Sequence, residues 1–317
     1  MKLFIIGGAG YIGSHMVKVA HLAGHDVITI DNLSTGHKDA VLHGQFEFCD
    51  ILNVEKLDKL FKKYKPDAVM HFSAFSLVGE SVKNPHKYYL NNVSGTLNLL
   101  KTMVDNNCMK FIFSSTAAIF GKPKYIPIDE RHPKNPINPY GKSKLMVEEI
   151  LKDFESAYGL KYVSFRYFNA AGHDPGGELL ERHDPETHLL PIVMQAVNGL
   201  RDSVSIYGND YDTEDGSCVR DFIHVNDLAD AHLKGLEYID KKESKSAEFN
   251  LGNGRGYSVK QVINKVKLMT GKEFKILSED KREGDPSVLV ASNSMAKNKL
   301  NLKINYPTLD EIIETIR

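Results

Sequence analysis

The chain has 317 residues, 42% of them hydrophobic and 26% charged, as in globular proteins that bury a sizeable core. Forty basic residues against 41 acidic ones leave a formal net charge of -1, so no global positive field would attract nucleic acid or an acidic membrane surface. The three cysteines, Cys49, Cys108 and Cys218, show no paired spacing, which argues against a disulfide framework or a structural zinc site and favours the cytoplasm.

Short apolar runs alternate with amphipathic segments in the first half of the chain. The first run leads directly into glycines, and no later run is long enough to span a bilayer, so we expect neither a signal peptide nor a membrane anchor. Strands are predicted at 2–6, 26–30, from 46, 68–72, 110–114 and 160–167. Helices are predicted between them at 11–23, 54–64, 85 to about 104, and 139–158. Such alternation indicates parallel pairing with right-handed crossovers, and therefore a Rossmann-type doubly wound sheet.

From about residue 169 the pattern loosens into a smaller mixed α/β lobe. The segment 173–188 is rich in proline and glycine and is predicted to be a loop. A strand at 203–207 and a helix near 258–269 follow. Two pairs have the spacing of a capping box, namely Ser258 with Gln261 and Thr308 with Glu311.

We divide the chain into an NAD-binding Rossmann domain, 1–168, and a substrate lobe, 169–317. The segment of about 219–240 is expected to return to the first domain. Because the chain contains no low-complexity linker, the two parts should be tightly joined, with the functional site between them.

A glycine-rich segment, Gly7-Gly8-Ala9-Gly10-Tyr11-Ile12-Gly13, lies between the first strand and the first helix. Its glycines permit a sharp turn, close approach of the backbone to a pyrophosphate, and close packing of helix on strand. The helix N-terminus adds free N–H groups and a partial positive charge. A glycine turn that binds nothing is the alternative, but the strand, the helix and a later acid in sequence favour dinucleotide binding.

The later acid is Asp31, at the end of the second strand. A carboxylate there accepts hydrogen bonds from a ribose diol and repels a 2′-phosphate, which favours NAD over NADP. The alternative is a strand-end aspartate that begins a turn with Asn32. Asp50 and Ile51 follow the third strand and are placed to hold the adenine, although the pair alone is typical of a turn.

Tyr140 and Lys144 are four residues apart on a predicted helix, and therefore on one face. A nearby cation favours the phenolate of a tyrosine, and a positively charged nicotinamide ring would add to this effect. Tyr140 is thus a candidate general base for a sugar hydroxyl. A surface pair at helical spacing is the common alternative. Ser114 and Thr116 end the fifth strand, where doubly wound sheets bind ligands, and a hydroxyl there can share the proton of the reacting alcohol.

These features together resemble the extended short-chain dehydrogenase/reductase family, and nearly the whole chain is similar to its UDP-galactose 4-epimerases. The matching segments are Gly7–His15, Asp31–Leu33, Val78–Ser81, Asn91–Thr96, Pro139–Leu145, Arg166–Asn169, Tyr207–Tyr211, Asp215–Gly216, Val219–Val225, Asn250–Leu251–Gly252 and Arg282–Asp285. The first and fifth are shared by the superfamily, whereas the later ones lie where the epimerases bind UDP-hexose.

The resemblance implies that UDP-glucose and UDP-galactose are interconverted through a 4-keto sugar, with NAD tightly bound. Tyr140 would take the proton of the 4-hydroxyl, assisted by Thr116, while the C4 hydride moves to NAD. Lys144 would reach the ribose of NAD. By analogy with the family, the protein would form a homodimer.

The resemblance also implies two sets of binding residues. Those placed at the cofactor are Gly7, Gly10, Tyr11, Ile12, Gly13, Asp31, Asn32, Ser34, Thr35, Gly36, Asp50, Ile51, Phe72, Ala74, Asn91, Ser114, Tyr140, Lys144 and Phe168. Those placed at the UDP-sugar are Thr116, Tyr140, Asn169, His188, Leu189, Ser205, Tyr207, Arg220, Arg282, Asp285 and Leu289. Arginines suit a diphosphate because a guanidinium binds its oxygens bidentately.

Three positions depart from the family pattern. Ser76 replaces a frequent lysine near the pyrophosphate, which predicts weaker NAD binding. His188 stands where an asparagine is often found beside the nucleotide. Leu289 replaces a frequent tyrosine at the sugar pocket, and the extra room makes N-acetylated UDP-sugars candidate substrates.

Several alternatives stay open. A 4-epimerase of UDP-N-acetylhexosamines or UDP-pentoses is the nearest, because a methylene or acetyl group changes binding by only a few kcal/mol. A dehydratase is disfavoured because Ala117 and Ala118 replace the Asp-Glu pair of that family. A reductase that releases its cofactor and a non-catalytic NAD-binding protein are the others. No metal site is predicted: His183 and His188 match no zinc motif and are interpreted as solvated loop residues.

Overall fold

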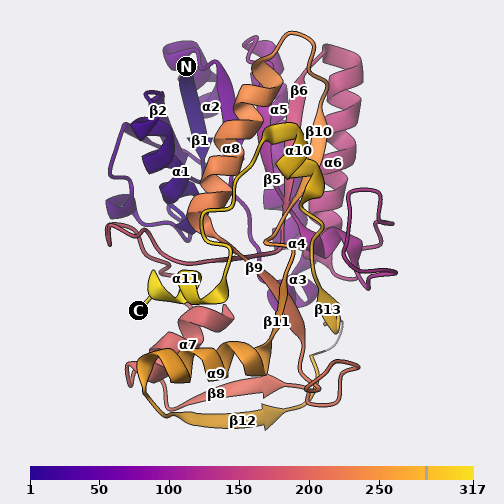
Figure 1. The fold of residues 1–317 in the computed structure, drawn as a ribbon. Coiled ribbons are helices and arrows are strands. Elements are labelled where there is room, and N and C mark those ends of the chain that lie inside the picture. The colour runs from indigo at the N-terminus through magenta and orange to yellow at the C-terminus, as the bar shows by residue number, and fades with distance from the viewer. Residues whose placement is uncertain (283–284) are drawn as a thin grey trace.

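A computed structural model describes residues 1–282 and 285–317 (Figure 1). Glu283 and Gly284, which belong to the Arg282–Asp285 segment, lie outside the described residues. Within the described ranges, no helix combines the length and the apolar character needed to span a bilayer.

The larger part of the protein is built on a seven-stranded parallel sheet with the strand order β10-β6-β5-β4-β1-β2-β3. Its strands are β1 (Lys2–Ile6), β2 (Asp26–Asp31), β3 (Gln45–Phe48), β4 (Ala68–His71), β5 (Lys110–Thr116), β6 (Lys161–Tyr167) and β10 (Ala247–Leu251). The predicted doubly wound sheet is therefore confirmed. Strand β10 has no counterpart among the predicted strands, because it joins β6 only after a long excursion of the chain.

Helices cover both faces of this sheet, so its strands are buried on both sides. One face carries α1 (Tyr11–Leu22), α8 (Val225–Asp240) and α10 (Ser294–Leu300); the other carries α2 (Val54–Tyr64), α5 (Thr96–Asp105) and α6 (Pro139–Tyr158). In β1, Leu3 and Ile5 belong to the core under α1 and α8, whereas Phe4 and Ile6 belong to the core under α2, α5 and α6. This alternation explains why the strand reads as a continuous apolar run.

The long helix predicted from residue 85 is interrupted. The chain forms α3 (Val78–Lys83), α4 (Pro85–Tyr88), a π-helix η2 (Tyr89–Gly95) and then α5. The Asn92 side chain fixes the wide turn: it accepts a hydrogen bond from the Phe75 N–H at 3.0 Å and donates one to the Phe75 carbonyl at 2.9 Å. A single π-turn is frequent at functional sites, and this one carries Asn91 beside the loop that follows β4.

The smaller part, at the bottom of Figure 1, contains two further sheets. Strand β9 (Val219–His224) pairs with β7 (Asn169–Ala171), β11 (Gly256–Ser258) and β13 (Val288–Leu289), and β8 (Ser203–Tyr207) pairs with β12 (Lys275–Glu279). Its helices are α7 (Leu189–Val197), α9 (Val259–Thr270) and α11 (Leu309–Glu314). Both predicted capping boxes, at the starts of α9 and α11, are confirmed.

The chain passes between the two parts more than once. Of the segment around 219–240, β9 pairs in the smaller part, whereas α8 packs on the large sheet. The chain then returns to the large sheet with β10 and again with α10. The two parts are therefore joined by several connections, as the lack of a linker predicts.

A buried ion pair fastens α6 to the sheet. Glu148 of α6 accepts two hydrogen bonds from the Arg166 guanidinium of β6, at 2.9 and 2.8 Å, and both side chains are fully buried. The Ser115 hydroxyl at the end of β5 donates a third, at 2.7 Å. Because α6 also carries Tyr140 and Lys144, this pair holds the helix that bears the candidate catalytic residues.

Replacing Glu148 with glutamine should lower the free energy of unfolding by about 3 kcal/mol or more, because a buried guanidinium loses its counter-charge. Urea unfolding of the purified variants measures the loss. Glu149→Gln is the matched control, since its side chain on the same helix is 58% exposed and pairs with Lys152. That change should stay within about 0.5 kcal/mol, and equal losses in the two variants would contradict a special role for Glu148.

Candidate active site

The glycine loop between β1 and α1 is packed so closely that side chains cannot replace two of its glycines. Gly7 has φ +80°, and a Cβ there would lie 2.5 Å from the Ser73 nitrogen. A Cβ at Gly13 would lie 2.1 Å from the Gly7 carbonyl oxygen, so close helix–strand packing is confirmed. The loop leaves the N-terminus of α1 facing outward as a cradle for an anion.

Asp31 supports this loop from the end of β2. Its carboxylate accepts hydrogen bonds from the Ala9 N–H at 3.0 Å and the Leu33 N–H at 2.8 Å, and the residue is 8% exposed. Burial raises the pKa of Asp31, while the backbone N–H groups oppose that rise. The remaining lone pairs of the carboxylate are suited to a ribose diol.

Asn32 and Asp50 are brought together across β2 and β3. The Asn32 amide donates to the Asp50 carboxylate at 2.8 Å, and its oxygen accepts from the Ser34 N–H at 3.0 Å. Asn32 therefore forms a turn directly after β2. Ile51 has its side chain buried in the core against Gly95, so only its backbone is available to a ligand.

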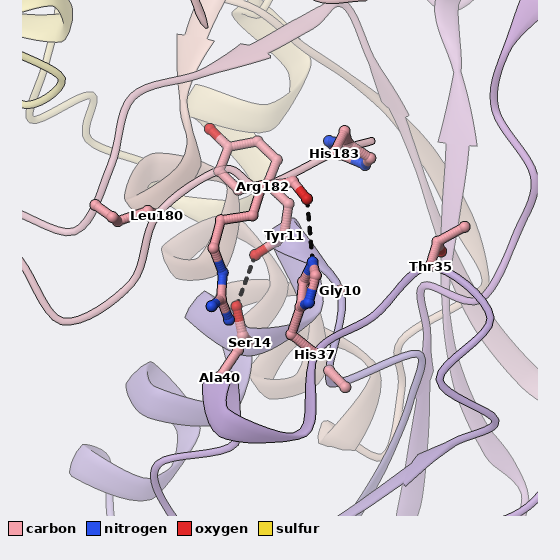
Figure 2. Close-up of a pocket in the computed structure, with 10 residues that line it drawn as sticks. Gly10, Tyr11, Ser14, Thr35, His37, Ala40, Leu180, Arg182 and His183 are labelled. Carbon is pink, nitrogen blue, oxygen red and sulfur yellow. Dashed lines mark hydrogen bonds between the residues drawn. The ribbon is translucent and has the colours of Figure 1, made fainter. Parts of the chain in front are cut away.

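A loop from the smaller part, residues 172–188, lies over the glycine loop. Figure 2 shows Leu180, Arg182 and His183 of this loop lining a small cavity together with Gly10, Tyr11 and Thr35. The His37 ring contacts the Arg182 carbonyl at 3.0 Å (Figure 2), and the Arg182 guanidinium pairs with Asp39 at 2.8 Å. The Tyr11 hydroxyl donates to the Gly172 carbonyl at 2.6 Å.

Tyr140 and Lys144 meet the end of β5. The Lys144 ammonium donates to the Ser114 carbonyl at 2.7 Å and lies 4.8 Å from the centre of the Phe113 ring. The residue is 3% exposed, and this burial lowers the pKa of Lys144 to about 7. Tyr140 lies one turn earlier on α6 and has Thr116 as its side-chain partner. The sequence-predicted group of Tyr140, Lys144, Ser114 and Thr116 is thus assembled at one sheet edge.

In the protein without cofactor, burial raises the pKa of Tyr140, and the hydrogen bond with Thr116 only partly opposes that rise. The expected lowering depends on the positive charge of a bound nicotinamide ring and stays a prediction. The neighbouring Ser115 turns away to Glu148, which agrees with a structural role.

A buried pair behind this site was absent from the sequence-based candidates. The Tyr167 hydroxyl lies 2.6 Å from Nε2 of His232, whose Nδ1 lies 2.7 Å from the Leu228 carbonyl. Burial lowers the pKa of His232 to about 4, so the neutral ring donates to Leu228 and accepts from Tyr167. The His232 ring also packs 4.9 Å from Phe72. A buried tyrosine hydroxyl usually has a hydrogen-bond partner, and this rule is the one signal from which the sequence could have indicated the pair.

The predicted substrate residues of the smaller part form two groups. In the first, the Arg220 guanidinium pairs with Asp285, and Leu289 lies beside Arg220 in register. Leu289 packs with Phe168 on the apolar cluster of Ala117, so this group reaches the residue that follows Thr116. In the second, the Arg282 guanidinium lies 3.7 Å from the centre of the Tyr207 ring.

The remaining predicted residues are distributed over both parts of the fold. Ala74 follows β4, Ser205 and Asn169 lie in β8 and β7, and Leu189 begins α7. The Asn91 amide donates to the Asn92 side chain at 2.9 Å. Ile12 packs against the core under α1.

His183 and His188 lie in the loop before α7, and their side chains are 29% and 39% exposed. His188 Nδ1 lies 2.8 Å from both Glu181 and Glu186, and His183 Nδ1 lies 3.1 Å from Glu181. The carboxylate side chains are only 1% and 4% exposed. Against the effect of burial, the two carboxylates raise the pKa of His188 to about 10. The sequence did not indicate these two buried partners.

The same architecture occurs in known enzymes. The model of the NAD dependent epimerase/dehydratase family matches residues 3–252. The UDP-glucose 4-epimerase of Halalkalibacterium halodurans is 48% identical over 314 residues, which cover 99% of this chain and 94% of that protein. The crystal structure of the Brucella ovis UDP-glucose 4-epimerase in complex with NAD superposes with a TM-score of 0.96 at 46% identity, covering 99% of this chain and 96% of that one.

A third relative, the UDP-Glc/GlcNAc 4-epimerase of Campylobacter jejuni, has a TM-score of 0.86 and 41% identity, with 99% and 97% of the two chains covered. Identity at this level over almost the full length of each relative extends through both the large sheet and the smaller part. The chain therefore belongs to the NAD dependent epimerase/dehydratase family, among its UDP-glucose 4-epimerases.

Proposed function

We propose that the protein interconverts UDP-glucose and UDP-galactose with an NAD that stays bound through the cycle. The observation that carries this proposal is the convergence of Tyr140, Thr116 and Lys144 at the carboxyl end of β5, on the sheet edge that also bears the glycine loop. A proton acceptor, a hydroxyl relay and a buried cation are what the reversible oxidation of a sugar hydroxyl needs.

The carboxyl ends of β1 and β2 would hold the dinucleotide. Gly7 and Gly13 allow the compact turn that sets the N-terminus of α1 beside it, and Asp31 would offer its free lone pairs to a ribose diol. NAD would supply a reversible hydride acceptor here. The Asn32–Asp50 pair and the Ile51 backbone would border the adenine, and Lys144 would reach the nicotinamide ribose.

Tyr140 is the proposed proton acceptor. Since burial raises its pKa, the protein alone keeps the phenol protonated, and a positive charge has to offset that cost. Lys144 supplies one such charge from a nearly solvent-free position, where it acts strongly. The oxidised nicotinamide ring adds a second. Tyr140 then takes the proton of the sugar 4-hydroxyl, with Thr116 sharing it, and returns it after the 4-keto sugar has turned.

Two arginines are proposed to hold the diphosphate of the substrate. Arg220 is paired with Asp285, and Arg282 is stacked on Tyr207, so both guanidinium groups are already oriented. Asn169, His188, Leu189 and Ser205 would complete the UDP-sugar site. Elimination of water is disfavoured, because Ala117 and Ala118 provide no acid–base group after Thr116.

UDP-N-acetylhexosamines are a second candidate substrate class. Leu289, beside Arg220, leaves more room than the tyrosine frequent at this place in the family. The similarity to the UDP-Glc/GlcNAc 4-epimerase of Campylobacter jejuni supports testing UDP-N-acetylhexosamines.

Incubation with UDP-glucose, without added reductant, should give UDP-galactose by NMR, with no net consumption of NADH. Tyr140→Phe should lower turnover by about 100-fold or more, because the proton acceptor is lost, while bound NAD is retained. Tyr158→Phe is the control, since it removes an exposed phenol at the far end of α6. A parallel reaction contains UDP-N-acetylglucosamine in place of UDP-glucose. Full activity of Tyr140→Phe would refute the proposed role.

Lys144→Met should stabilise the cofactor-free protein most at and below about pH 7. The unfolded lysine titrates near pH 10.4 and the folded one near 7, so between these values the unfolded state binds more protons and wild-type stability rises with pH. The advantage of the variant should therefore shrink by about 2 kcal/mol from pH 7 to pH 9, measured by urea unfolding. Lys142→Met, at an exposed position of α6, is the control. A pH-independent advantage would contradict the burial cost.

We further propose a homodimer in the cytoplasm. Exposed apolar side chains lie on neighbouring elements of one side: Val82 of α3, Leu90 of η2, Leu97 of α5 and Met146 of α6. Such a surface suits an interface between copies of the chain. The unpaired, buried thiols of all three cysteines suit a reducing compartment.

Light scattering during size exclusion should give a mass about twice the chain mass of 35.5 kDa. Leu97→Glu should shift the protein toward the monomer, because a carboxylate would be buried at the interface. Leu268→Glu, on the exposed face of α9, should not. A monomer of the wild-type protein at micromolar concentration would refute the dimer.

A further inference from the structure

The loop before α7 gathers four metal-ligating side chains in eight residues. Glu181, His183, Glu186 and His188 each place one nitrogen or oxygen within 4.8 Å of those of the other three. The loop lies over the glycine loop and is held there by the Arg182–Asp39 pair and by the contact of His37 with the Arg182 carbonyl. The cluster is therefore part of a fixed surface and not of a free chain end.

Two buried carboxylates converge on one imidazole nitrogen. Nδ1 of His188 lies 2.8 Å from both the Glu181 and the Glu186 carboxylates, although it carries at most one hydrogen. Glu186 also accepts hydrogen bonds from the Thr187 N–H at 2.7 Å and the His188 N–H at 2.8 Å. The two carboxylate side chains are 1% and 4% exposed, so water solvates their charge poorly.

The charge of the cluster is also unbalanced. Two carboxylates with neutral imidazoles carry two negative charges, and a proton on His188 removes only one of them. The remaining charge lies beside the cofactor loop, since the His183 ring is 6.3 Å from the Tyr11 ring. Negative charge at this place would repel the pyrophosphate proposed for the neighbouring glycine loop. A bound dication would remove that repulsion.

We propose that Glu181, His183, Glu186 and His188 bind one divalent transition-metal ion of the Zn²⁺ class. Two imidazole nitrogens and two carboxylate oxygens form a donor set that Zn²⁺ accepts in tetrahedral geometry. Bond lengths of about 2.0–2.1 Å place tetrahedral ligands about 3.3 Å apart, close to the 2.8 and 3.1 Å contacts already present. The metal replaces the shared proton on His188 Nδ1, and Nε2–H of that ring remains a donor for a bound nucleotide.

The metal would cross-link the loop 181–188 at the point where it covers the cofactor loop. The site holds a structural metal: all four proposed positions are filled by side chains, which leaves none for substrate.

The test uses untagged protein with its bound cofactor, treated with EDTA and dialysed. Titration with ZnCl₂ by calorimetry should show one site per chain, and Co²⁺ should give the intense visible bands of tetrahedral coordination. Glu186→Gln and His183→Asn should each weaken Zn²⁺ binding by at least about tenfold. Glu178→Gln is the matched control, because its side chain in the same loop pairs with Lys18 and lies outside the cluster.

Circular dichroism establishes that each variant is folded, and two independent ligand variants keep the result interpretable if one is not. Equal Zn²⁺ affinity in Glu186→Gln, His183→Asn and Glu178→Gln would overturn the proposal, since binding would then come from other histidines. So would a pale, octahedral Co²⁺ spectrum. None of these readouts depends on epimerase turnover, so failure of the metal site leaves the proposed reaction untouched.

Discussion

Lys144 is an ammonium group enclosed almost completely by protein, beside the carboxyl end of strand β5. Its one hydrogen-bond partner in the described chain is the carbonyl of Ser114, at 2.7 Å, and its other neighbour is the face of the Phe113 ring. A carbonyl dipole and an aromatic face stabilise a cation only in part, so burial costs free energy and the pKa falls to about 7. In the proposed mechanism, the same enclosure would make its charge effective at the phenol of Tyr140, because little water would be present to screen it.

The helix that carries this cation has to be held in place. A buried ion pair between α6 and the neighbouring strand β6 does so. Glu148 and Arg166 join α6 to β6, and Ser115 adds the end of β5. The adjacent residues of β5 therefore have divided tasks: the Ser114 carbonyl meets the lysine and Thr116 meets Tyr140, while Ser115 anchors the helix. The strand alternation that directs successive side chains to opposite faces makes this division possible.

The smaller part contributes by returning to the large sheet at several points. Leu289 and Phe168 pack on the apolar cluster at Ala117, which brings Arg220 and Asp285 toward the end of β5. On the other side, the loop 172–188 reaches across to Asp39 and Tyr11.

The periodicity of apolar residues alone determined most of the large sheet, because a parallel strand covered on both faces must be apolar throughout. It also determined the placement of Tyr140 with Lys144, since four residues on a helix bring two side chains to one face. Family resemblance, in turn, identified the arginines and Leu289.

Only the tertiary structure decided the features that depend on distant segments. Strand β10 needed β6 as its partner, and the π-turn at Asn91 needed the Phe75 backbone to hold Asn92. The upward shift in the pKa of Tyr140 follows from burial, which no spacing of residues reveals. In the same way, the sequence presents His183 and His188 as loop histidines, and only the fold of that loop shows them beside two buried carboxylates. Local pattern specifies the elements, whereas burial and long-range contacts specify the chemistry.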